Sequence, residues 1–136
     1  MNEFTPFLLS QVGKAARGLV AARFAQDGRR MWHMRILHAL AASPVAQRDL
    51  SPGLGIDPSD VAKALDELAG WGEVERERDP ADRRRVIVQI TEAGRASLAR
   101  MGEQVHEVRE HLLAPLDEAE RDTLHGLLRR VHAALD

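Results

Sequence analysis

A capped helix followed at once by two short strands constrains the fold more than any other feature of this 136-residue sequence. Asp57 suits an N-cap, Pro58 suits the first helical position, and Asp60 suits the closing position of an acidic capping box. Gly70 and Gly72 are suited to ending the helix. The apolar residues between these limits recur at helical spacing and predict one buried stripe: Val61, Ala64, Leu65 and Leu68.

Two strands joined by a tight turn are predicted directly after this helix. Segments 74–78 (VERER) and 85–90 (RVIVQI) have strand character, and the intervening DPADRR has the aspartate and proline content of a turn. Alternation along the first strand places Arg76 and Arg78 on one face and both glutamates on the other. A run of balanced charge therefore becomes a one-sided basic strip.

Helices are predicted over most of the remaining chain. Residues 46–51 form a short helix that Pro52-Gly53 ends. Thr91 caps a long helix over 92–112 with a heptad seam, the pattern of a helix that packs along another helix. The seam consists of Leu98, Met101, Val105, Val108 and Leu112. The other predicted helices cover residues 4–26, 30–43 and 117–135, the last with Asp117 and Glu120 as a capping box.

Composition excludes several classes of function. The formal net charge of −2 provides no bulk attraction to nucleic acid, so any basic surface must be local. Without cysteine the chain can form no disulfide and perform no thiol chemistry. It shows neither a membrane-length apolar run nor a secretory signal, which predicts a cytoplasmic protein with no membrane partner. We find no nucleophile–base set, paired carboxylates or phosphate-binding glycine loop, so no enzymatic activity is predicted.

The histidines raise the alternative of a metal site. His106 faces Glu110 and Glu107 faces His111 at a spacing of four residues, which allows either chelation or simple charge pairing. His106 and His111 themselves are about 140° apart on a straight helix and cannot share one metal. We favour exposed helix histidines and predict neither a metal nor another cofactor.

The element order predicts a winged helix-turn-helix. We expect one domain, mainly α with a small β-hairpin wing (α+β), whose residues 31–91 form a DNA-binding lobe. In this class the second helix of the motif enters the major groove, led by its N-terminal residues. At about 100° per residue, its outward face carries Ser59 and Lys63 in the leading half. Asp66 and Glu67 follow at the trailing end.

The hairpin is predicted to be a second DNA probe. An arginine on a thin projecting loop fits the narrow minor groove, where the potential is most negative. Asp82 would repel phosphate if left free, so we expect it to hold an arginine in position. We assign helix 57–69 to the major groove and wing 74–90 to the minor groove. The predicted DNA-binding residues are Gln47, Ser59, Lys63, Arg76, Arg78, Arg83, Arg84 and Arg85.

The segment LGIDPSDVAKALDELAGWGEVERERDPADRRRVIVQITEAG resembles the core of the MarR (multiple-antibiotic-resistance regulator) family of winged-helix transcription factors. The wing carries the resemblance, through Asp79-Pro80, Asp82-Arg83-Arg84 and the closing Ile90-Thr91-Glu92-Ala93-Gly94. The helix order extends it over essentially the whole chain. The resemblance implies that Arg84 is the minor-groove contact and Asp82 its brace.

The resemblance also implies partners. These are a double-stranded DNA operator, a second copy of the chain joined through dimerisation helices in 1–27 and 92–136, and a small-molecule effector. Many family members are repressors released by a ligand bound between the dimerisation helices and the lobe. Phe24, Trp32 and Met34 are candidates for lining that ligand pocket, although aromatic residues and methionines at helical spacing more often form plain core.

Three positions depart from the family pattern. Ala46 replaces the usual serine or threonine cap, Pro52-Gly53 interrupts a region of helix, and Glu73 replaces an apolar residue. Trp71 is expected to supply the missing cover at Glu73. The proline-glycine break, the negative net charge and a recognition helix with one outward basic residue support an alternative. In that alternative the chain is a winged-helix protein-interaction module that has lost DNA binding.

Overall fold

The computed structural model describes residues 3–135. Over this range the chain forms six helices and three short strands. The elements in order are α1 (Thr5–Ala25), α2 (Met31–Leu40), β1 (Val45–Ala46), α3 (Gln47–Leu54), α4 (Pro58–Gly70), β2 (Val74–Arg78), β3 (Val86–Ile90), α5 (Glu92–Leu112) and α6 (Glu118–Ala133). None of these helices is long and apolar enough to cross a lipid bilayer.

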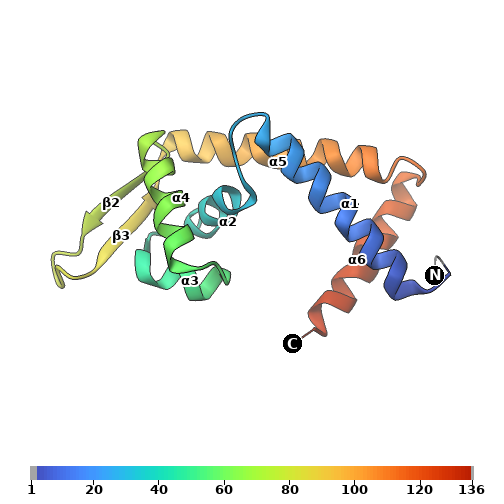
Figure 1. Ribbon diagram of the computed structural model, residues 1–136, viewed down its shortest axis with the longest axis horizontal. Helices are drawn as coiled ribbons and strands as arrows, with labels where there is room; N and C mark the ends of the chain where they lie inside the picture. Colours follow the sequence, from blue (N-terminus) through green and yellow to red (C-terminus); the bar gives the residue numbers. More distant parts are fainter. Residues whose placement is uncertain (1–2, 136) are drawn as a thin grey trace.

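The long helix α5 connects two differently built ends of the molecule (Figure 1). At one end α2, α3 and α4 gather beside the β2–β3 hairpin, and we call this part the lobe. At the other end α1 and α6 cross below α5, and we call these three helices the arm. The hairpin tip and the start of α1 therefore lie at opposite ends of the molecule.

The sheet has three antiparallel strands in the order β1-β3-β2. Val74 pairs with Ile90 and Arg78 with Val86 across the hairpin, while Val45 of β1 pairs with Val88 on the other side of β3. The predicted fold class, mainly α with a small β wing, is confirmed. The prediction of only two strands is wrong, because β1 has two residues and is too short to show an alternating pattern.

The apolar stripe predicted for α4 forms the centre of the lobe. Leu65 and Leu68 are completely buried, and Val88 of β3 is buried with them. The alternation of β2 and β3 places Val74 and Val88 on the side that faces this core. The buried members of the lobe cluster are Ile36, Leu37, Leu40, Leu50, Val61, Ala64, Leu65, Leu68, Val74 and Val88.

The helix before α4 is longer than the sequence predicts. Pro52 does not end α3, which continues to Leu54 and stops at Gly55 in a left-handed conformation with φ of 66°. Proline removes one N–H and crowds the preceding turn, and α3 nevertheless continues for two residues beyond Pro52. The start of α3 lacks a side-chain cap, as expected, because the N-cap Ala46 has only a methyl group and cannot accept a hydrogen bond.

The start of α4 differs in one detail from the prediction. Asp57 is the N-cap, but its carboxylate accepts the backbone N–H of Ser59 rather than closing a box with Asp60. The predicted acidic capping box is therefore wrong. Because Asp60 is one methylene shorter than the glutamate of the usual box, it reaches less far back toward the cap. At the start of α6, by contrast, the predicted box of Asp117 and Glu120 is formed.

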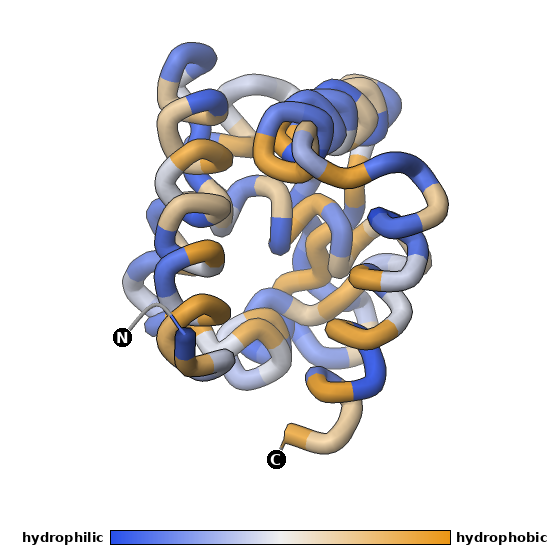
Figure 2. Tube along the Cα trace, turned by 90° about the vertical axis from the view of Figure 1, so that its right-hand side faces the viewer, coloured by the Kyte–Doolittle hydropathy of each residue, from blue (hydrophilic) through white to orange (hydrophobic). Residues whose placement is uncertain are grey.

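The heptad seam of α5 divides between the two ends of the molecule. Leu98 packs against the lobe cluster, whereas Met101 is buried with Val20 and Phe24 of α1. Helix α6 is different, because each of its described residues is at least partly exposed. Figure 2 views this end of the molecule and shows hydrophobic stretches recurring along α1 and α6.

Candidate nucleic-acid interface

The leading half of α4 presents both predicted major-groove residues to solvent. Ser59 and Lys63 are exposed. The Ser59 hydroxyl donates to the carboxylate of Asp57 at 2.9 Å. The N-cap carboxylate therefore accepts two hydrogen bonds from Ser59, one from its backbone N–H and one from its side chain. These bonds lower the pKa of Asp57 below its ordinary value. Lys63 therefore provides the positive charge on this half of the helix, beside a cap that stays ionised.

The two acidic residues of the trailing half have intramolecular partners. Arg76 of β2 donates to Asp66 at 2.8 Å, which turns this arginine toward the end of α4. The carboxylate of Glu67 lies 3.3 Å from Nε2 of the buried His33. Glu67, expected on the outward face, is 37% exposed and also covers His33 from the rim of the lobe. Both contacts give these carboxylates partners within the protein and so reduce the repulsion between α4 and the phosphates of a nucleic acid.

The loop between β2 and β3 is closed by its own backbone and aspartates. The N–H of Asp79 donates to the carbonyl of Arg85 at 2.8 Å, and the N–H of Arg85 donates to the carbonyl of Asp82 at 2.9 Å. The carboxylate of Asp79 also accepts the N–H of Ala81, a local turn typical of aspartate. The wing tip is therefore a defined turn.

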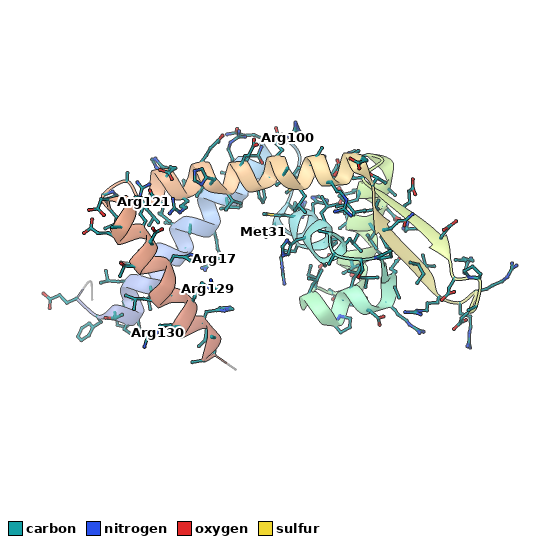
Figure 3. All side chains as sticks on the ribbon, turned by 180° about the vertical axis from the view of Figure 1, so that it is seen from behind. Arg17, Met31, Arg100, Arg121, Arg129 and Arg130 are labelled. Atoms are coloured by element: carbon teal, nitrogen blue, oxygen red, sulfur yellow. The ribbon has the colours of Figure 1, made fainter. Side chains whose placement is uncertain are left out.

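The side chain of Arg84 is 91% exposed, compared with 38% for Arg85 and 31% for Arg76. The carboxylate of Asp82 accepts the Arg84 backbone N–H at 3.1 Å and its Nε–H at 3.3 Å. Both bonds leave the terminal guanidinium nitrogens available for a ligand. Figure 3 shows side chains projecting from the hairpin tip, the end of the molecule farthest from α6.

The other wing arginines serve the hairpin in different ways. Arg85 lies between two carboxylates, 3.6 Å from Asp79 and 4.0 Å from Asp49 of α3, so it ties the wing to the helix-turn-helix. Arg78 donates to the backbone carbonyl of Arg83 at 2.7 Å, and the Arg83 side chain is exposed.

A hollow of 440 Å³ lies where the starts of α3 and α4 meet the wing. It brings together Gln47 and Arg48 of α3, Pro58 of α4, and Arg84 and Arg85 of the wing. Arg48 is exposed and was missed by sequence reasoning, which considered only its neighbour Gln47. The available signal was its place in the first turn of α3, next to a predicted contact residue.

The three predicted ligand-binding residues pack in two different clusters. Phe24 is completely buried in the arm, and Met34 packs against the same cluster. Trp32 packs instead against the lobe cluster. A hollow of 390 Å³ lies elsewhere, between α1, α5 and α6, with Arg121 on its wall. Figure 3 shows Arg121 near the turn between α5 and α6.

This geometry defines a class of protein: a winged helix-turn-helix with an exposed leading face on its second helix and an arginine at the tip of its wing. Comparison with known proteins supports the same class. The MarR family profile matches residues 27–85.

Two relatives and two solved structures extend the match. A protein described as a transcriptional regulatory protein for the hcr operon of Thauera aromatica is 34% identical over 71% of this chain and 59% of its own length. The HTH-type transcriptional repressor NicR of Pseudomonas putida is 31% identical over 65% of this chain and 56% of its own. The chain thus spans less than two thirds of these relatives.

Among solved structures, wild-type apo MarR from E. coli superposes with a TM-score of 0.82 at 25% identity, covering 94% of this chain and 96% of that one. A mutant of E. coli MarR complexed with operator DNA gives a TM-score of 0.70 at 26% identity and 96% coverage of both chains. Together these matches support a MarR-family winged-helix regulator.

Proposed function

We propose that this chain is a homodimeric, sequence-specific DNA-binding transcriptional regulator. The hollow between α3, α4 and the wing carries the proposal, because it joins Arg48, Arg84 and Arg85 to the N-terminus of α4. Free N–H groups at a helix start and arginine side chains both favour phosphate. The operator-bound MarR structure has this fold, which supports the same use of the surface.

The roles of individual residues follow from where they lie. Ser59 and Lys63 would meet the major groove and Arg84 the minor groove, with Asp82 holding Arg84. Gln47, Arg48 and Arg83 would contact the phosphate backbone. The pair Arg76–Asp66 would hold the wing against α4, while Arg85 would close the wing through Asp79 and hold it to α3 through Asp49. Arg78 would keep the loop closed through its bond to the Arg83 carbonyl.

The apolar surface of the arm supports a homodimer. Large apolar residues on α1 and α6 and directly beside their ends are 42% to 69% exposed, a patch of the kind that marks an interface. They are Phe4, Phe7, Leu8, Leu9, Val12, Leu127, Leu128, Val131 and Leu135. Two such arms would place two lobes on half-sites about one helical turn, ~10 bp, apart. Sedimentation of wild type and Val131→Glu tests this, since a charge in the interface should shift the dimer toward monomer.

A repressor that responds to a small molecule is the mode of action we propose, on the strength of NicR, whose name describes a repressor. An effector would act by favouring a dimer whose lobes no longer match the half-sites. Phe24, Trp32 and Met34 remain predictions for the effector site. A promoter–reporter assay separates repression from activation, because deletion of a repressor raises expression and deletion of an activator lowers it.

Fluorescence anisotropy tests DNA binding, using duplexes from the DNA upstream of the gene and from selection on a random library. Wild-type affinity should fall steeply as salt rises, and Arg84→Ala should weaken binding roughly tenfold or more. Arg100→Ala removes an arginine whose side chain is 63% exposed on α5, far from the wing, and should bind as wild type does. If wild type selects no duplex even at low salt, the protein-interaction module becomes the better account.

A further inference from the structure

We propose that the buried ion pair of Arg29 and Glu73 is a positioning pair that sets the orientation of the recognition helix α4 relative to the arm. Its use in DNA reading rests on the function proposed above. Glu73 is only 4% exposed, so its charge needs a partner within the fold.

The pair is bidentate and enclosed. Nη1 of Arg29 donates to one Glu73 carboxylate oxygen at 2.6 Å, and Nη2 contacts the other. The two side chains are only 11% and 5% exposed. The ring of Trp71 lies over the guanidinium, with its centroid 4.1 Å from Cζ, and covers the pair as predicted. A bidentate pair between planar groups accepts a narrow range of orientations.

Glu73 lies where α4, the wing and α5 meet. Its N–H donates to Leu68 at 2.9 Å across Gly72, whose φ is 73°, and this closes the end of α4. Its carbonyl accepts the N–H of Thr91 at 3.0 Å, at the start of α5. The next residue, Val74, begins β2. The side chain of Glu73 is therefore attached to the point that joins α4, the wing and α5.

Arg29 lies on the other side of the junction, in the link 26–30 between α1 and α2. Two further bonds surround it: Gln104 of α5 donates to Asp27 at 2.7 Å, and the N–H of Arg30 donates to His33 at 2.9 Å. The link is thus held to α5 at one residue and to the end of α4 at another. Arg29 is the residue that makes the second connection.

Apolar and polar contacts both meet at this junction, because Met34 of α2 packs against the arm cluster while Ile36 and Leu37 of the same helix belong to the lobe cluster. The lobe cluster and the arm cluster of Val20, Phe24 and Met101 are separate, and different residues of α5 pack against each. A buried ion pair adds little net stability compared with apolar residues of similar size, because both charges lose their hydration. Its contribution here is directional: it determines the angle at which the two clusters are joined.

A distance measurement tests the orientation without DNA. The chain has no cysteine, so Lys14→Cys on α1 and Lys63→Cys on α4 accept spin labels specifically. Labelled chain diluted with unlabelled chain should give a narrow distance distribution. Adding Arg29→Met and Glu73→Leu together removes both charges, keeps the volume, and should broaden or shift it. An unchanged distribution in a folded double variant would overturn the proposal.

The matched control is the exposed pair of Arg23 and Glu107, which also bridges two elements, at 3.2 Å between α1 and α5. Arg23→Met with Glu107→Leu should leave the distribution unchanged, and broadening there by the same amount would also count against the proposal. Thermal unfolding of both double variants shows that each is folded before its distances are compared.

DNA affinity then tests the use of the orientation. On the operator selected by wild type, the Arg29→Met/Glu73→Leu variant should bind at least tenfold more weakly and discriminate less against half-sites moved by one base pair. Binding equal to wild type would overturn the role in DNA reading. If wild type itself selects no operator, the proposed function fails, and the label distances alone decide whether the pair orients α4.

Discussion

The backbone of Gly94 at the start of α5 lies directly against the carbonyl oxygen of Glu73. A Cβ added to Gly94 would be 2.2 Å from that oxygen and 2.7 Å from a side-chain carbon of Ile90. Backbone and a packed strand residue cannot move aside cheaply. The close approach lets the N–H of Thr91 reach the same carbonyl at 3.0 Å and brings α5 onto the end of α4.

We therefore predict that Gly94→Ala lowers the free energy of unfolding by roughly 3 kcal/mol, the range of a severe overpacking change. Gly102→Ala is the matched control on the same helix, since nothing lies within 4 Å of its added Cβ. It should stabilise the protein by up to about 1 kcal/mol through helix propensity. Urea unfolding of both variants measures the difference, and equal effects would contradict the packing argument.

The capping of α4 predicts an asymmetry between two neighbouring aspartates. Asp57→Ala removes the acceptor of the Ser59 N–H and hydroxyl and should lower stability. Asp60→Ala should cost less, because the box expected from the sequence is not formed. Thermal unfolding at neutral pH gives the order, and a larger loss for Asp60→Ala would show that the box forms in solution.

Substitutions of Arg85 and Arg84 should distinguish the residue that keeps the wing ordered from the residue that is free to contact DNA. Arg85→Ala removes the link to Asp79 and Asp49 and should speed hydrogen exchange of the wing amides, including the N–H of Asp79. Arg84→Ala should leave exchange nearly unchanged, because its side chain is 91% exposed. Faster exchange in both variants would mean that Asp82 and Arg84 also hold the turn.

His33 predicts a pH-dependent stability. Burial lowers its pKa below 6.5, opposed by its hydrogen bond to Glu67 and by the charge of that carboxylate. Nδ1 accepts the N–H of Arg30, so Nε2 carries the hydrogen that points to Glu67. A second proton on Nδ1 would face the N–H of Arg30 and break the start of α2.

The sign of the effect follows from proton linkage. At a pH below the ordinary histidine pKa, His33 is protonated in the unfolded chain but stays neutral in the folded chain. The contribution of His33 is therefore complete above about pH 6.5 and declines as the pH falls toward the lowered folded pKa. Urea unfolding at pH 7.5 and 5.5 should show a larger loss in wild type than in His33→Gln, which cannot titrate. Equal losses would exclude His33 as the cause.

Much of this architecture is determined by local sequence. The stripe of α4, the ends of the hairpin and the caps Asp57, Thr91 and Asp117 were predicted, because each depends on a helical or strand period or on a hydrogen bond within a few residues. The same local signals bring Asp82 to Arg84, two residues apart.

Only the tertiary structure decided what joins these elements. Arg29 and Glu73 are 44 positions apart, and His33 and Glu67 are 34 apart. No local period relates such residues, so the sequence showed a glutamate in an apolar position but could not show the arginine that binds it. The physical reason is that a buried charge must find its partner in space, and chain folding, rather than sequence spacing, brings that partner within reach.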